Sequence, residues 1–186
     1  MSIRNHLITL ASMMIITAGY AQSRYYTKTA TITFFSKTDL ENIEAVNKTV
    51  TAAMDTRSGA VQFSVPMKAF SFAKGLMQEH FNENYVESDK YPNSVFKGTI
   101  KDNGKLRYDI PGTYDVTVNG DLTIHGVTRP VSAKGKINVA EGSITISSVF
   151  QILLSEYNIS IPTLVNDKIS KSIKINVHGK LEPLNR

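Results

Sequence analysis

A regular alternation of apolar and polar residues runs through most of the chain, and it restricts the possible folds more than any other feature. In segment 59–67 every second residue is apolar: Val61, Phe63, Val65 and Met67. Side chains of a β-strand point in turn to opposite faces, so this spacing predicts a strand with one buried face.

Seven further segments have a comparable strand-like pattern. They are 29–36, 43–54, 94–101, 114–124, 127–139, 143–154 and 172–181. Breaks rich in glycine, asparagine and aspartate separate several of them, as at 102–104 and 141–142. About eight strands in one domain predict a mainly β fold, either a sandwich or a barrel.

One segment departs from this alternation. Between 72 and 85 the apolar and amphipathic residues follow helical spacing: Leu76, Met77, His80, Phe81 and Tyr85. We expect one helix here, with Ser71 as its cap. Gly75 weakens an isolated helix by about 1 kcal/mol relative to alanine, so the helix should depend on packing against the sheet.

The N-terminus has the pattern of a secretory signal peptide. Arg4 precedes a short apolar run over 7–18, and Gly19-Tyr20-Ala21 has the small residues of a cleavage site. We therefore expect a signal peptide over 1–21 and a single exported domain over 22–186, periplasmic or secreted. An N-terminal membrane anchor is the alternative.

Composition argues against several classes of partner and stabilisation. The chain has no cysteine, so an exported form must fold without disulfides. The net charge is +5, but the lysines are interspersed with acidic residues, unlike the basic stripe of a nucleic-acid-binding protein. No later segment is apolar over a length that could cross a membrane. We expect no nucleic acid and no transmembrane segment in the mature chain.

Catalytic and metal-binding patterns are also missing. His80, His125 and His178 lie in different predicted elements, and no His-Glu-x-x-His or Gly-x-Ser-x-Gly motif is present. We predict neither a metal site nor an enzyme, although a hydrolase built from dispersed residues is a weaker alternative. Glu79, Glu83 and Glu87 recur every four residues; a solvated face explains them better than acid–base catalysis or calcium binding.

Two histidines need separate interpretations. His125-Gly126 interrupts two strand-like runs, so we expect a structural turn in which His125 bonds a backbone carbonyl. His80 lies on the apolar stripe of the predicted helix, either as a core residue, which we favour, or as a polar contact for a ligand.

The string over 122–131, LTIHGVTRPV, resembles the YceI-like family of exported lipid-binding proteins. His80-Phe81 followed by the segment 88–92, SDKYP, and Phe96 strengthens the resemblance. Met77 and Gln78 stand where many members have an Arg-Asp pair. The resemblance implies an extended antiparallel barrel of lipocalin type with a helix packed near it, and in some members a polyisoprenoid inside.

We therefore expect a soluble carrier of a long apolar lipid such as a polyisoprenoid, without another cofactor. The alternative is an envelope interaction protein with a solidly packed barrel and no ligand. Phe34 and Phe35 raise the further alternative of a homodimer. The residues predicted to line the cavity are Val61, Phe63, Val65, Met67, Leu76, Met77, His80, Phe81 and Tyr85.

Overall fold

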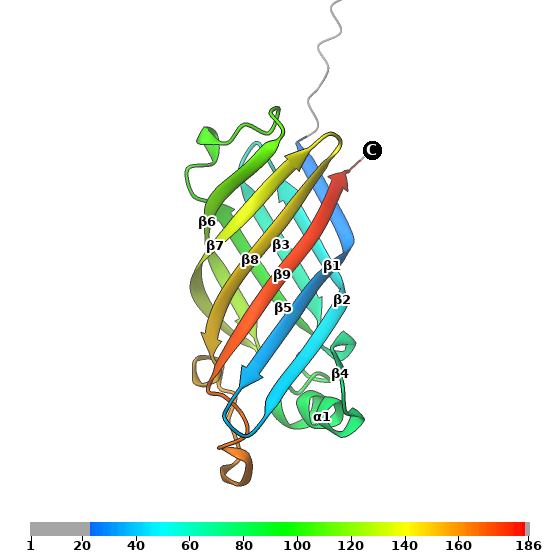
Figure 1. The fold of residues 1–186 in the computed structure, drawn as a ribbon, viewed down its shortest axis with the longest axis vertical. Helices are drawn as coiled ribbons and strands as arrows, with labels where there is room; N and C mark the ends of the chain where they lie inside the picture. Colours follow the sequence, from blue (N-terminus) through cyan, green and yellow to red (C-terminus); the bar gives the residue numbers. More distant parts are fainter. Residues whose placement is uncertain (1–22, 185–186) are drawn as a thin grey trace, which may run out of the picture.

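The structure is a computed structural model that describes residues 23–184, and its main feature is a long β-barrel (Figure 1). The barrel strands are β1 (Arg24–Lys37), β2 (Asn42–Asp55), β3 (Ala60–Pro66), β5 (Asn93–Ile100), β6 (Gly112–Ile124), β7 (Val127–Ala140), β8 (Ser143–Leu153) and β9 (Ser172–Pro183). Each of the eight predicted segments corresponds to one of these strands. The predicted signal peptide, 1–21, lies outside the described residues.

The strands close into a ring. Each one pairs antiparallel with the next along the chain, and β9 returns to pair with β1. Closure gives every strand two neighbours, so the barrel wall has no long unpaired edge. The expected closed antiparallel barrel of lipocalin type is confirmed.

The alternation of side chains sets which residues face the interior. In β3, Val61 and Val65 are buried, whereas Gln62 between them is exposed. Met67, just beyond the strand in the 3₁₀ turn η1 (Met67–Ala69), is also buried. The predicted inner face of this segment is confirmed.

The helical segment is shorter than predicted. The helix α1 spans Gly75–His80 and continues into a π-helical turn, η2 (Phe81–Tyr85). Ser71 does not cap it, because Ser71–Phe72 form the short strand β4, which pairs with Val46 and Ala45 of β2. The residues predicted to begin the helix therefore form a strand instead, because they pair with β2, which is distant in the sequence.

The interior is filled at one end of the barrel, the upper end in Figure 1. Met54, Ile144 and Leu181 come from three strands and are 2%, 1% and 0% exposed. The segment 101–111, which contains the turn η3 (Asn103–Lys105), lies over this end, and Tyr108 from it packs against the core. We call this the closed end.

Hydrogen bonds hold that covering segment in place. The Tyr108 hydroxyl donates to Asn103 Oδ1 at 2.7 Å, and the Asn103 side-chain amide donates to the Thr56 carbonyl at 2.8 Å. Burial raises the pKa of Tyr108 to about 12, so its hydroxyl remains protonated at neutral pH.

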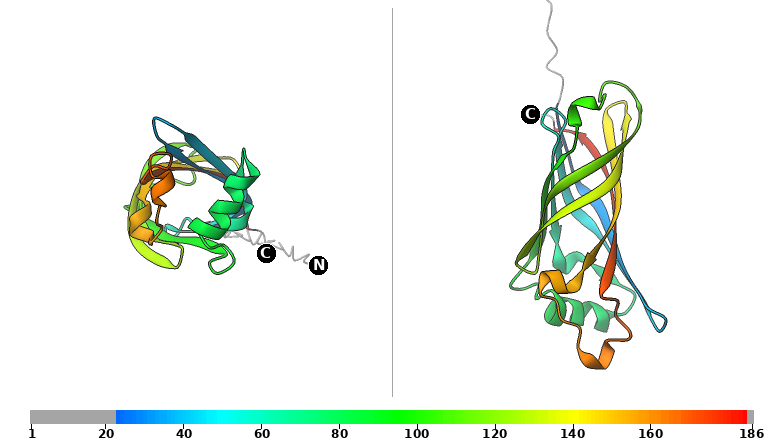
Figure 2. Two further views of the ribbon diagram at one scale, coloured as in Figure 1. Left: turned by 90° about the horizontal axis from the view of Figure 1, so that it is seen from below. Right: turned by 90° about the vertical axis from the view of Figure 1, so that its left-hand side faces the viewer.

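Irregular segments gather at the opposite end of the barrel. They are the turn 38–41 between β1 and β2, α1 with η2, and the segment 154–171 with its turns η4 (Leu154–Tyr157) and η5 (Thr163–Val165). Figure 2 looks directly onto this end in its left panel. We call it the open end.

Candidate functional site: an apolar cavity at the open end of the barrel

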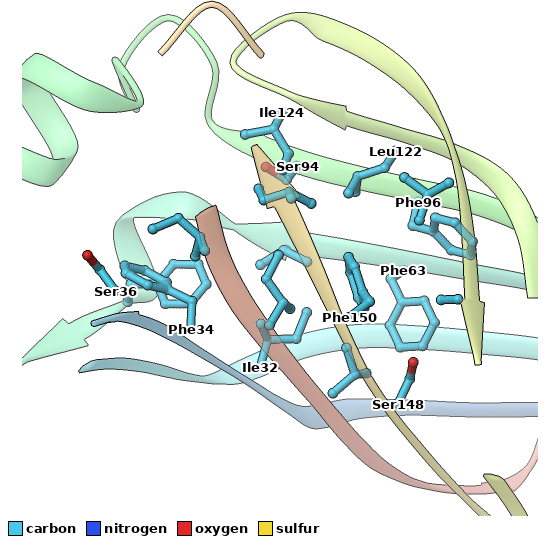
Figure 3. Close-up of a pocket in the computed structure, with 18 of the residues that line it drawn as sticks. Ile32, Phe34, Ser36, Phe63, Ser94, Phe96, Leu122, Ile124, Ser148 and Phe150 are labelled. Carbon is cyan, nitrogen blue, oxygen red and sulfur yellow. The ribbon is translucent and has the colours of Figure 1, made fainter. Parts of the chain in front are cut away.

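A cavity of about 350 Å³ occupies the barrel interior. Its walls carry residues from the barrel strands, and Phe34, Phe63, Phe96 and Phe150 project into it from four of them (Figure 3). The cavity also reaches Glu41, Val165 and Lys168 in the segments of the open end, whereas Ile144 and Leu181 of the closed end do not line it. The hollow is therefore a channel closed at one end.

Eight of the nine residues predicted to line a cavity do so. They are Val61, Phe63, Val65, Met67, Met77, His80, Phe81 and Tyr85. Leu76 is not among the lining residues, and its side chain is 62% exposed. It lies at the edge of the helical stripe in the first turn of α1, so its side chain faces solvent and not the channel. Contact between these residues and a ligand stays a prediction.

His80 differs from the interpretation favoured from the sequence. It is exposed to solvent at the end of α1 and also lines the cavity, so it is not a core histidine. The short helix ends at this residue and leaves it at the rim. The alternative, a polar contact for a ligand head group, therefore remains as a prediction.

Sequence reasoning missed much of the wall. The cavity is also lined by apolar residues of β1, β5, β6, β8 and β9, among them Ile32, Phe34, Phe96, Leu122, Phe150 and Ile175. The same two-residue alternation that selected β3 occurs in these strands and was the signal that could have found them. Phe34 points into the cavity, whereas Phe35 lies beside the Lys174 ammonium, 5.9 Å from its ring centre. The homodimer stays a prediction.

Four phenylalanines attach the helical segment to the barrel. The ring of Phe81 lies 5.1 Å from that of Phe72, 5.4 Å from that of Phe34 and 5.7 Å from that of Phe70, centre to centre. Such tilted and stacked pairs add about 0.5–1.5 kcal/mol each to the burial of the rings. They explain how a helix of six residues, with glycine at its start, is held at the mouth of the channel.

Three serine hydroxyls of the cavity wall already have hydrogen-bond partners within the protein. The Ser94 hydroxyl donates to the sulfur of Met67 at 3.0 Å, and that of Ser148 donates to the Lys134 carbonyl at 2.7 Å. Ser36 Oγ accepts the Ser170 backbone N–H at 2.8 Å. The interior thus presents an apolar surface to a guest, with few groups available to direct it.

Charged and titratable groups lie toward the mouth. Glu41 forms an ion pair with Lys74 at 3.4 Å, which links the β1–β2 turn to the residue before α1. Burial raises the pKa of Tyr85, which keeps this phenol neutral. The cavity thus changes from apolar in its depth to amphipathic at its rim.

The predicted turn at His125-Gly126 is confirmed and has a second partner. Both residues have positive φ, 51° and 74°, and they join Ile124 to Val127 in a two-residue hairpin of the type that requires this geometry. His125 Nδ1 donates to the Tyr157 carbonyl at 3.2 Å, as expected of a turn histidine.

The second partner is Glu87. Its carboxylate oxygen lies 2.6 Å from His125 Nε2, and the Tyr91 ring meets the imidazole edge-on at 4.8 Å. The Glu87 side chain is 44% exposed but is held by the His125 imidazole, whereas Glu79 and Glu83 are exposed, as expected of a solvated face. These contacts tie three segments of the open end together: the loop after η2, the β6–β7 hairpin and η4.

Within residues 23–184, no group of three or more histidine, cysteine, aspartate or glutamate residues is placed to hold a metal ion. In the same range no helix has both the length and the apolar character needed to span a bilayer.

Comparison with known proteins gives a consistent result. The YceI-like domain model matches residues 22–181. A polyisoprenoid-binding domain from Saccharophagus degradans, described as implicated in plant cell wall breakdown, superposes with a TM-score of 0.75 at 14% identity, covering 87% of this chain and 99% of that one.

Two further solved structures share the fold. BcnA of Burkholderia cenocepacia has a TM-score of 0.68 at 17% identity, over 82% of this chain and 95% of its own. A Campylobacter jejuni YceI protein has a TM-score of 0.57 at 16% identity, over 100% and 92%. No curated protein matches the sequence. Since the family model spans almost all of the described barrel, the chain belongs to the YceI-like family.

Proposed function

We propose that the protein is an exported carrier that holds one long apolar chain of polyisoprenoid type in its barrel. The observation that carries this proposal is the apolar channel of about 350 Å³, open at one end. Pockets that bind small molecules have volumes of about 300–1,000 Å³, so the channel falls in the relevant range. The name of the Saccharophagus degradans relative gives independent support for a polyisoprenoid ligand.

The chemistry of the wall favours binding over catalysis. Ser94 and Ser148 are engaged within the protein, so neither is offered to a substrate as a nucleophile. The hollow interior also disfavours the alternative of a solidly packed barrel that acts only through its surface.

Binding energetics set the length of the chain. Each buried methylene contributes about 0.8 kcal/mol, so one prenyl unit contributes roughly 3–4 kcal/mol. Association and ordering cost on the order of 4–15 kcal/mol. A ligand that makes few directed contacts must therefore be several prenyl units long, with its head group left near the rim and His80.

The proposal is tested by lipid content and uptake. The protein is purified from its native host, and the extract is examined by mass spectrometry for a stoichiometric lipid. Uptake of an added long-chain polyprenol is then compared between the wild type and Val65→Trp, which places an indole in the channel. Gln62→Trp is the matched control, since residue 62 lies on the same strand but faces outward.

We expect Val65→Trp to lower polyprenol affinity by about tenfold or more, since the bulk displaces buried methylenes, and Gln62→Trp to leave it unchanged. A wild-type protein that carries no lipid and takes up no polyprenol would refute the proposal. Its export is checked separately, by sequencing the N-terminus of the protein recovered from the cell envelope or medium, where Gln22 is expected.

A further inference from the structure

Three strongly exposed leucines surround the mouth of the channel. Leu40 in the β1–β2 turn is 65% exposed, Leu76 in α1 62% and Leu164 in η5 93%. Each comes from a different segment of the open end. Exposed side chains of this size are tolerated singly on a protein surface, but their gathering around one opening indicates an apolar partner.

The leucines are continuous with the cavity. The residue that follows each of them, Glu41, Met77 or Val165, lines the channel. The rim therefore alternates between a side chain that faces inward and a leucine that faces solvent. At the closed end, Ile110 is 45% exposed but adjoins no opening of the channel.

Two of the leucines are presented by hydrogen-bonded turns. In the β1–β2 turn the Thr38 N–H donates to the Glu41 carbonyl at 3.0 Å, and the Glu41 N–H donates to the Thr38 hydroxyl oxygen at 3.1 Å. Around Leu164, the Val165 N–H donates to the Pro162 carbonyl at 3.0 Å. Figure 1 shows both turns extending beyond the barrel wall at this end.

Positive charge gathers on one side of the mouth. The segments 37–41, 74–76 and 158–174 contain five lysines and three acidic residues, a net charge of +2: Lys37, Lys74, Lys168, Lys171, Lys174, Asp39, Glu41 and Asp167. Glu79 and Glu83 on the helix side bring this sum to zero. The lysines are in excess only within 158–174, around η5, where three lysines stand against Asp167. Lysines beside exposed leucines are typical of surfaces that contact lipid head groups.

We propose that the open end docks on the surface of a lipid bilayer, with Leu40, Leu76 and Leu164 inserted at the level of the head groups. Docking places the mouth of the channel against the acyl region, so a long apolar chain passes between bilayer and barrel without exposing its methylenes to water. The inference rests on the proposed function, since docking serves to load or unload the carried lipid. Binding to vesicles can nevertheless be measured independently of lipid carriage.

The test is vesicle flotation of the exported form, residues 22–186. Vesicles of phosphatidylcholine alone are compared with vesicles that also contain phosphatidylglycerol. The variants are Leu164→Asp and the triple Leu40→Asp/Leu76→Asp/Leu164→Asp, with Ile110→Asp at the closed end as the control. Thermal unfolding verifies that each variant is folded.

We expect Leu164→Asp to weaken vesicle binding by about tenfold or more, the triple variant to abolish it, and Ile110→Asp to change it by less than about twofold. Stronger binding to the vesicles that contain phosphatidylglycerol would show that the lysines contribute to membrane binding. Equal losses in Leu164→Asp and Ile110→Asp, or no binding to either vesicle by the wild type, would overturn the inference.

Polyprenol delivered from cyclodextrin, without vesicles, separates the two proposals. Leu164→Asp should take up this polyprenol as the wild type does, while it extracts polyprenol from vesicles more slowly. A wild type that binds polyprenol from cyclodextrin but no vesicle leaves the carrier function standing and removes the docking surface. Vesicle binding that depends on the leucines, without uptake of polyprenol, would leave the docking surface standing and remove the carrier function.

Discussion

The two ends of this barrel are built from the same eight strands and differ in almost every other respect. At the closed end, side chains such as Ile144 and Leu181, which are neighbours on β8 and β9, are buried and line no cavity. Toward the open end, residues such as Ile175 and Phe150 line a hollow. A barrel of this size lies at the limit where side chains either fill the interior or leave room for one guest. Here both outcomes occur in one molecule.

The difference indicates a division of tasks along the barrel axis. We expect the packed end to supply most of the stability of a fold without disulfides, and so to allow unfilled space at the other end. The comparison can be tested by paired substitutions, one at each end.

The largest expected effect comes from truncating matched isoleucines. Ile144→Ala at the closed end should lower the free energy of unfolding by about 2–5 kcal/mol, because it leaves a cavity in a filled core. Ile175→Ala on the channel wall should cost about 1–2 kcal/mol, since that side chain already borders empty space. Urea unfolding followed by circular dichroism measures both, and equal losses would contradict the division.

A second pair compares the hairpin turns of the two ends. Gly126, in the β6–β7 turn, and Gly142, in the β7–β8 turn, have similar positive φ, 74° and 70°. An added Cβ at Gly126 would lie 2.5 Å from the Tyr91 ring, whereas at Gly142 it would meet open space.

We therefore expect Gly126→Ala to destabilise the protein by about 2–4 kcal/mol, from backbone strain and displacement of Tyr91. Gly142→Ala should cost about 1–2 kcal/mol, from strain alone. Thermal unfolding of the two variants isolates the contribution of the Tyr91 contact. If Gly142→Ala proved as costly as Gly126→Ala, that contact would have no role in stability.

The smallest effect concerns the segment over the closed end. The pKa of Tyr108 is raised from its ordinary 10.0 to about 12, so the unfolded chain releases this proton before the folded chain does. The stability that Tyr108 contributes should thus be complete below pH 10 and decline as the pH rises toward about 12.

Tyr108→Phe should lose about 1 kcal/mol at neutral pH with the hydrogen bond to Asn103, and its stability should fall less steeply than that of the wild type between pH 10 and 12. The burial-raised pKa values of Tyr85 and Tyr157 affect both proteins alike. Chemical denaturation across this pH range provides the measurement, and parallel curves would exclude a role for Tyr108 ionisation.

Much of the cavity could be predicted from local spacing. The alternation in β3 identified Val61, Phe63 and Val65 as inward-facing, and the same rule applied to β1 would have placed Phe34 beside them. The helical stripe correctly selected Met77, Phe81 and Tyr85 but also Leu76, because spacing specifies a stripe and not how far the barrel wall extends to cover it.

Contacts between distant segments were beyond such reasoning. Glu87 and His125 are far apart in the chain and meet only because the loop after η2 passes the β6–β7 hairpin. Ser71–Phe72 form a strand and not the start of a helix for a similar reason: they pair with Ala45 and Val46 of β2, which are distant in the sequence.

The sequence by itself determined the eight strands, their inward faces and the hairpin at His125-Gly126, because each depends on the periodicity or φ angles of neighbouring residues. Only the tertiary structure decided that the interior is filled at one end and hollow at the other. That property depends on the summed volumes of side chains brought together from all eight strands, and no single strand contains it. The same holds for the three leucines at the mouth, which are ordinary exposed residues until the fold places them around one opening.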